Sequence, residues 1–150
     1  MLYATILYNG NAELPQNFKK AFELFSKVAR KYPTGATASA LKNKIEAAKL
    51  SDTVRSNANS AASAAGYIAT MYLRGEGVAV DNATARQWFE KCAEWECAAC
   101  YNALGVMNRD GSHGFIKNLL KAREYFVLGA AKSDSNAQAN LGEMYYGNHV

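Results

Sequence analysis

AREYFVLGA, residues 122–130, is the stretch that decides the fold, because the chain carries the same phrase three times. The other copies are AFELFSKVA at residues 21–29 and ARQWFEKCA at residues 85–93, and the second and third copies start 37 residues apart. Ala recurs at the first and ninth places and Phe at the fifth: Ala21, Phe25, Ala29, Ala85, Phe89, Ala93, Ala122, Phe126 and Ala130. Self-similarity at a period of about 20 to 50 residues is the signature of stacked repeats, which build extended binding surfaces more readily than reaction pockets.

Each phrase predicts an amphipathic helix. In the third copy Ala122, Phe126, Gly129 and Ala130 fall at i, i+4, i+7 and i+8, which is one face of a helix with about 3.6 residues per turn. The small Ala residues allow neighbouring helices to approach closely, and the aromatic residues fill the wider space between them. We therefore expect the three Phe residues to lie in the core.

A second recurring segment precedes each phrase. It reads AAGYIATMYLRG at residues 64–75, CYNALGVMNRDG at 100–111 and AQANLGEMYYG at 137–147, and LYATILYNG at 2–10 is a weaker copy. The terminal glycines, Gly75, Gly111 and Gly147, are 36 residues apart and suit the left-handed backbone of a helix C-terminus. Asp81 and Asn118 are expected to cap the second helix of their units. Each unit is thus predicted to be a helix, a Gly-containing loop and a second helix.

These residues resemble the Sel-1-like repeat family, a branch of the tetratricopeptide-like solenoids. The matching residues are Leu104-Gly105-Val106-Met107, Met71-Tyr72, Gly75-Glu76-Gly77-Val78, Asp81, Ala85, Trp88-Phe89 and Lys91-Cys92-Ala93, with Gly142 in a further Leu-Gly pair. Departures are Asn108, Ala69 and the longer loop at Ser112-His113. The resemblance implies an all-α, right-handed solenoid of antiparallel helix pairs, with units at 1–30, 61–96, 97–133 and 134–150, the last of them truncated.

Residues 31–60 form an insertion, because the first two phrases are 64 residues apart instead of 37. Residues 31–35 (KYPTG) are expected to end the preceding helix, residues 38–50 to add a short helix, and the polar residues 51–60 to form a loop. Insertions of this kind often carry a partner contact, although loop variation without function explains it equally well. Neither terminus supplies a polar cap for the solenoid, so we expect a segment of a longer array.

Charge and motifs argue against several functions. The net charge is +4, and residues 1–50 hold eight Lys or Arg against three Glu. Since the aromatic residues occupy core positions, a solvated basic surface explains this charge better than nucleic-acid binding. His113 and His149 are expected in separate loops, too far apart for one metal ion, and no nucleophile–base set is present. We expect no enzyme activity, cofactor, metal or membrane-spanning segment.

The cysteines leave two interpretations open. Cys92 and Cys100 flank the turn between two units, where the next unit has Gly129 and Ala137, so both are explained as small core residues. The alternative is a disulfide, which needs an oxidising compartment. Cysteine-rich members of the resembled family use bridges of this spacing, offset by one position from these cysteines. Cys97-x-x-Cys100 also matches a redox or zinc half-site, but a single pair is weak evidence.

Asn82-Ala83-Thr84 is an N-glycosylation acceptor motif at the expected start of a helix. This motif, the insertion and residues 7–10 and 14–18 resemble the luminal adaptors of the HRD ubiquitin ligase, fungal type, in endoplasmic-reticulum-associated degradation. The resemblance implies a membrane-anchored parent whose luminal repeats bind misfolded glycoproteins, a lectin and the membrane subunit of the ligase; self-association into a homodimer is also compatible with it. Two alternatives stay open. One is a Sel-1-like regulator of cell-wall synthesis or signalling, and the other is a secreted, cysteine-bridged repeat protein with ligand-binding or hydrolase-like activity.

Overall fold

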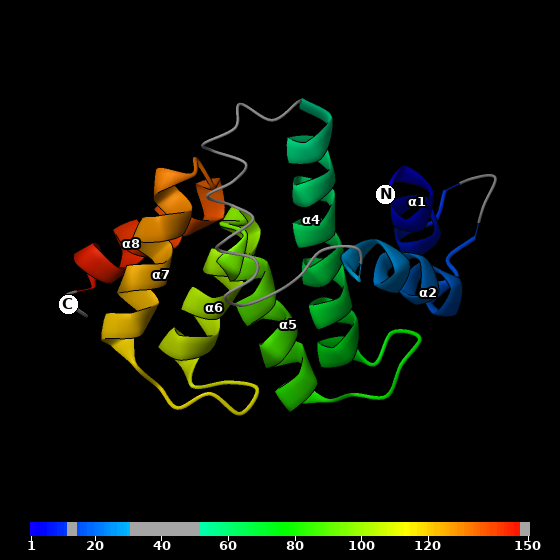
Figure 1. Ribbon diagram of the computed structural model, residues 1–150. Coiled ribbons are helices and arrows are strands. Elements are labelled where there is room, and N and C mark those ends of the chain that lie inside the picture. The colour runs from blue at the N-terminus through cyan, green and yellow to red at the C-terminus, as the bar shows by residue number, and fades with distance from the viewer. Residues whose placement is uncertain (12–14, 31–51, 148–150) are drawn as a thin grey trace. The chain divides into compact units, whose positions relative to one another are not determined.

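The computed structural model describes residues 1–11, 15–30 and 52–147, and in these residues the chain is helical without strands (Figure 1). The predicted all-α class is therefore confirmed for this part of the chain. The helices are α1 (Leu2–Asn9), α2 (Phe18–Ala29), α4 (Asp52–Arg74), α5 (Asn82–Glu94), α6 (Ala98–Asp110), α7 (Leu119–Ala131) and α8 (Ser135–Tyr146). Each phrase forms the second helix of a pair: α2 after α1, α5 after α4 and α7 after α6.

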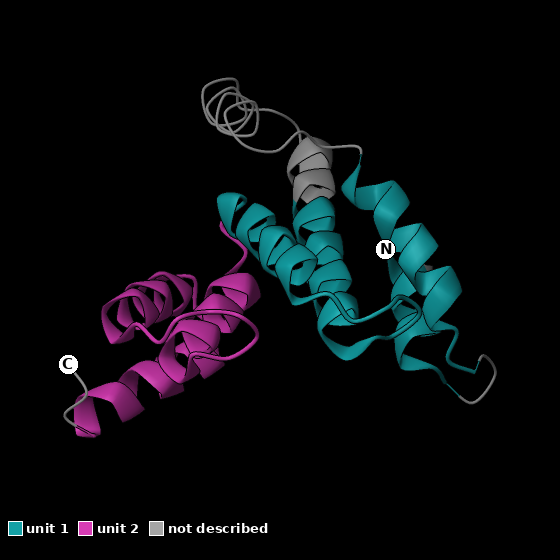
Figure 2. Cartoon of the chain, turned by 90° about the horizontal axis from the view of Figure 1, so that it is seen from below, with its two compact units in different colours: residues 1–95 teal, residues 96–150 magenta. Residues whose placement is uncertain are grey.

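The chain divides into two compact units, residues 1–95 and residues 96–150 (Figure 2). In unit 1, α1 packs against α2, α2 against α4 and α4 against α5. In unit 2, α7 packs against both α6 and α8, and α6 also contacts α8. Both units therefore contain the same helix pair, and in each the second helix packs on the first helix of its own pair.

One backbone hydrogen bond recurs in every complete pair. The residue that caps the second helix donates its N–H to a carbonyl oxygen near the end of the first helix: Asn17 to Leu7 (2.8 Å), Asp81 to Tyr72 (3.0 Å) and Asn118 to Asn108 (2.7 Å). The side chains of the same three residues accept hydrogen bonds from the first turn of the helix that they begin. A single residue thus starts the second helix, as predicted for Asp81 and Asn118, and also fixes it to the first helix, which the sequence did not predict.

The Phe of each phrase lies in the core, as predicted. Phe25, Phe89 and Phe126 are buried, and so is the Ala at the start of each phrase. In unit 2 the ring of Phe126 lies directly against Gly105, where a Cβ atom would come within 2.4 Å of the ring. In unit 1 the ring of Phe25 stacks on Tyr67 with centroids 4.6 Å apart.

Unit 1 also contains a polar contact between α1 and the loop after α4. The Tyr8 hydroxyl donates to the Glu76 carboxylate at 2.7 Å. Burial and this hydrogen bond raise the pKa of Tyr8 to about 12, so the hydroxyl keeps its proton across the physiological range. Glu76 also lies 3.7 Å from Arg74.

The loops show where glycine is needed and where it is not. Gly75 and Gly111 have φ of 71° and 65°, the left-handed conformation predicted for them. Gly147 has φ of −79°, so the same prediction is wrong there, and the C-terminus of α8 is closed by right-handed backbone. Glu96 and Ser133, in equivalent turns 37 residues apart, adopt positive φ of 56° and 64° without being glycine.

The predicted loop at residues 51–60 is also wrong, because α4 begins at Asp52. The segment contains neither Gly nor Pro, and it runs without interruption into residues 61–65, where four Ala residues are buried. Extending an anchored helix costs far less than nucleating one, so a polar segment attached to it stays helical. The extra helix predicted at residues 38–50 lies outside the described residues.

Two glycine substitutions should change stability in opposite directions. Gly105→Ala places a methyl group against the buried ring of Phe126 and should destabilise the protein by about 1–3 kcal/mol, as overpacking does. Gly142→Ala has no atom within 4 Å of the new methyl and should stabilise it by about 0.5–1 kcal/mol. Urea unfolding followed by circular dichroism measures both, and equal effects would contradict the close packing at Gly105.

Candidate protein-interaction surface

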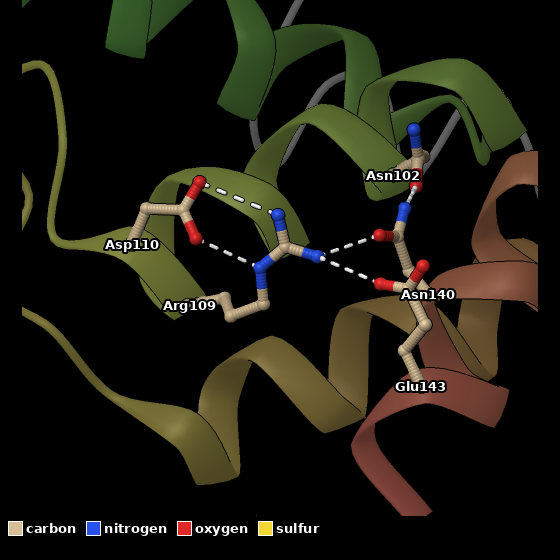
Figure 3. A network of polar contacts seen from close by, with 5 residues as sticks. All are labelled: Asn102, Arg109, Asp110, Asn140 and Glu143. Atoms are coloured by element: carbon tan, nitrogen blue, oxygen red, sulfur yellow. Dashed lines mark hydrogen bonds and ion pairs between the residues drawn. The ribbon is translucent and has the colours of Figure 1, made fainter. Parts of the chain in front are cut away.

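The first helices of unit 2, α6 and α8, carry a connected set of polar side chains (Figure 3). Arg109 is at its centre, in the last turn of α6. Its Nε and Nη2 donate to the two carboxylate oxygens of Asp110 at 2.8 and 3.4 Å. Its Nη1 donates to Asn140 Oδ1 at 2.6 Å and lies 3.8 Å from a Glu143 oxygen. We call Asn102, Arg109, Asp110, Asn140 and Glu143 the α6–α8 polar surface.

Two amides extend this surface away from the charges. Asn140 Nδ2 donates to Asn102 Oδ1 at 2.9 Å, a contact between residues 38 apart in sequence. Asn102 is half-buried, and its Nδ2 donates to no side chain or carbonyl in the described part of the chain, so both of its hydrogens are left without a protein acceptor there. The surface therefore offers unused amide donors at one end and exposed carboxylates at the other, which suits the carbonyls and N–H groups of a polypeptide.

The electrostatics of Arg109 connect this surface to the core. The hydrogen bond to Asp110 is the largest effect and raises the pKa of the Arg109 guanidinium; burial opposes it, and the charges of Asp110 and Glu143 add smaller effects that raise the pKa. The same hydrogen bond lowers the pKa of Asp110 below its usual range. The guanidinium carbon also lies 6.0 Å from the centroid of the Phe126 ring. Arg109 is thus held between an ion pair on one side and a core aromatic on the other.

The sequence did not reveal this surface. Asn102, Arg109 and Asn140 differ from the residues at the matching places of the other repeats, so they do not form part of the recurring pattern. The available signal was indirect: polar residues on the first helices that the recurring pattern does not explain. Among the predicted repeat residues, Ala93 and Ala130 are only half-buried, whereas Gly105 is buried.

The cysteines lie at the junction of α5 and α6. Cys92 is buried in α5 of unit 1, and Cys100 is buried in α6 of unit 2. Cys97, between them in the sequence, is half-buried and has a free thiol. Because the predicted bridge would join different units, it stays a prediction to be tested on the protein in solution.

Asn82 is exposed and is the first residue of α5. The next two residues of its acceptor motif are tied into the helix cap: Asp81 accepts from the backbone N–H groups of Ala83 and Thr84, and the Thr84 hydroxyl donates to Asp81 at 2.6 Å. These bonds lower the pKa of Asp81. Nothing among the described residues covers the Asn82 side chain, and its glycosylation stays a prediction.

The remaining predicted features add no site. His113 is exposed in the loop after α6, and His149 lies outside the described residues. No helix in the described part of the chain is both long enough and apolar enough to cross a membrane.

The repeats found by comparison with known proteins coincide with the helix pairs of the structure. A family model described as Sel1 repeat matches residues 1–32, 60–94, 98–134 and 135–148, which is most of the chain. This chain belongs to the Sel1 repeat family. The predicted family is confirmed, and with it the α-solenoid class. No curated protein matches the chain.

Two solved structures share the Sel1 fold. A Sel1 repeat protein from Oxalobacter formigenes is 24% identical, with a TM-score of 0.53, over 96% of this chain and 61% of that one. The protective antigen c5321 of uropathogenic Escherichia coli, which displays an SLR fold, is 21% identical, with a TM-score of 0.54, over 96% of this chain and 32% of the antigen. This chain therefore spans less than two thirds of either structure, and the likeness concerns the fold.

The ion pair in this Sel1 repeat chain should make stability depend on pH in acid. Because Arg109 lowers the folded-state pKa of Asp110, the contribution is present above the ordinary aspartate pKa of about 3.9 and is lost as the pH falls through the lower folded value. Asp110→Asn should lower the free energy of unfolding, measured by urea denaturation at neutral pH, by about a few tenths of a kcal/mol because the pair is partly exposed, and the difference from the wild type should vanish in acid. The double variant Asp110→Asn/Arg109→Gln is the control, and a difference that persists in acid would contradict the assignment.

The disulfide can be located by peptide mapping. In protein purified without reductant and alkylated, cleavage after Lys, Arg and Glu should give residues 92–94 linked to residues 97–109, with the alkyl group on Cys97. Cys97→Ser should keep this linkage. Three alkylated cysteines in unreduced protein would show that Cys92 and Cys100 are unpaired core residues.

Proposed function

We propose that this Sel1 repeat chain is a non-catalytic binding scaffold, and that it acts as part of a luminal adaptor in endoplasmic-reticulum-associated degradation. Sel1 repeats mediate protein–protein interaction, and the fold here is that of the family. The observation that carries the scaffold proposal is the α6–α8 polar surface, which presents unused amide hydrogens and exposed carboxylates in one connected network. Main-chain groups of a bound polypeptide would complete these hydrogen bonds.

The luminal part of the proposal rests on separate observations. Asn82 is exposed in a glycosylation motif, and the bridge expected between Cys92 and Cys100 would persist in an oxidising compartment. The resemblance of residues 7–10 and 14–18 to adaptors of the HRD ubiquitin ligase adds the partners: misfolded glycoproteins, a lectin and the membrane subunit of the ligase.

The cysteines favour one second candidate, a secreted, cysteine-bridged repeat protein that binds ligands outside the cell. One of the similar solved structures is named as a protective antigen of uropathogenic strains. A regulator of cell-wall synthesis or signalling would share the scaffold but would not need the disulfide.

The proposal is tested by capture of a model client. The immobilised chain is offered an unfolded glycoprotein, its folded form, and the unfolded form without glycans. We expect it to retain the unfolded glycoprotein, and Asn102→Ala/Glu143→Ala should reduce the affinity about tenfold because two contacts of the α6–α8 polar surface are lost. Glu124→Ala, which removes an exposed charge from α7, is the matched control.

The outcomes separate the candidates. Equal retention of folded and unfolded forms would contradict a quality-control role. Capture that the double variant leaves unchanged would show that the α6–α8 polar surface is not the binding site. Protein isolated from its native cells with no glycan on Asn82 would contradict the luminal assignment.

A further inference from the structure

We propose that Cys97 and Cys100 form an alternative disulfide, and that the chain exchanges it with the bridge expected between Cys92 and Cys100. Cys100 is common to both bridges, so only one of them is present at a time. The first turn of α6 is then the site of a thiol–disulfide exchange. This inference does not depend on the proposed scaffold function, but it rests on the bridge predicted from the sequence.

Cys97 and Cys100 lie at the two ends of the first turn of α6, and both belong to unit 2. Cys97 is the N-cap residue, and its carbonyl oxygen accepts the N–H of Cys100 at 3.1 Å. The Sγ atoms of the two residues lie within 4.8 Å of each other. A disulfide needs Cα atoms about 4.4–6.8 Å apart, and residues three apart in a closed turn have such a separation. Rotation of the two side chains can therefore bring the sulfurs together without a shift of the helix.

The two cysteines differ in exposure, and this difference assigns their roles. Cys97 is half-buried and has a free thiol, whereas Cys100 is 2% exposed. The attacking group in thiol–disulfide exchange is a thiolate, which forms where water reaches the sulfur. The attacked sulfur needs only the thiolate beside it. Cys97 is therefore the attacking residue, and Cys100 supplies the sulfur that is attacked.

The equivalent turn of the next repeat holds an anion at the position of Cys97. Asp134 and Ala137 follow Cys97 and Cys100 by 37 residues each. The Asp134 carboxylate caps α8 and accepts the N–H of Ala137 at 2.7 Å. The cap of α6 has no such side-chain hydrogen bond. The first turn of α6 thus offers its N–H groups to a thiolate on Cys97, as the first turn of α8 offers them to a carboxylate.

The exchange is balanced without an external oxidant or reductant. The Cys97 thiolate attacks the Sγ of Cys100, and the S–S bond between Cys92 and Cys100 breaks as the new S–S bond forms. Cys92 leaves as a thiolate and takes up a proton from water, which replaces the proton that Cys97 lost. One bridge would join unit 1 to unit 2, and the other lies within unit 2. The exchange therefore adds or removes a covalent link between the units without changing the redox state of the chain.

The test labels the free thiol of the full chain after equilibration. Protein purified without reductant is held at about pH 8, where an ordinary thiol is partly ionised, with no oxidant or reductant added. It is then treated with excess N-ethylmaleimide and cleaved after Lys, Arg and Glu. The main product should carry the label on Cys97, with residues 92–94 linked to residues 97–109. We expect a second product with the label on Cys92 and an internal disulfide in residues 97–109.

Two variants assign the second product to the exchange. Cys97→Ser removes the attacking thiol, so the label on Cys92 should be lost. Cys92→Ala leaves Cys97 and Cys100 as the cysteines of the chain, and glutathione disulfide should convert them into the internal disulfide of residues 97–109. Cooperative thermal melts show which variants are folded. If Cys92→Ala does not fold, the comparison of wild type with Cys97→Ser decides the matter.

Three results would overturn the proposal. Label on Cys97 alone in the equilibrated wild type would show that no second isomer forms. Label on Cys92 in Cys97→Ser would show that the bridge opens without the attack of Cys97. Three labelled cysteines in the wild type would remove the predicted bridge and the exchange with it. Because no binding partner takes part in these measurements, failure here is distinguishable from failure of the glycoprotein capture.

Discussion

The hydrogen bond between the two helices of each pair is the constraint on which the rest of the structure depends. In three pairs, the N–H of the capping residue of the second helix donates to a carbonyl near the end of the first. This bond fixes where the second helix begins relative to the first, and hence which residue faces the Phe of the phrase. Gly105 opposite Phe126 is the clearest consequence, because a one-residue shift of either helix would place a side chain where there is no room. Register and packing in the pair are thus decided together.

In unit 2 the same constraint leaves part of the first helices to carry polar side chains. In unit 2 the second helix and the core occupy two sides of α6, and Asn102 and Arg109 lie on a third, where they meet Asn140 and Glu143 of α8 (Figure 3). Arg109 holds this surface rigid because its donors bond to both helices while its guanidinium lies over Phe126. A surface whose side chains are already ordered loses less entropy when a partner binds.

The sequence predicted the core and capping residues that recur in every repeat, and it missed the polar contacts that do not recur. Phe25, Phe89 and Phe126 could be assigned to the core because helical spacing and recurrence gave the same answer, and Asp81 and Asn118 because a cap needs a particular residue type. The polar composition of residues 51–60 predicts a loop, but polarity signals only exposure, and α4 begins at Asp52. The α6–α8 polar surface could not be predicted, since Arg109 and Asn140 meet only after two helices 31 residues apart are packed. The left-handed backbone of Gly147 was inferred from position alone, and position does not fix φ.

The turns between the repeats, unlike the core, contain backbone conformations that ordinary residues disfavour. Glu96 and Ser133 hold a left-handed backbone that costs an ordinary residue about 1 kcal/mol and costs glycine nothing. Their neighbourhood is tied by the Glu96 carboxylate, which accepts from Lys132 Nζ at 2.6 Å. Because the turns at Glu96 and Ser133 are equivalent, the cost of the left-handed backbone is incurred at both of them. The stability of a repeat array can therefore be changed in small steps by the choice of residue at its turns, while the core residues stay the same.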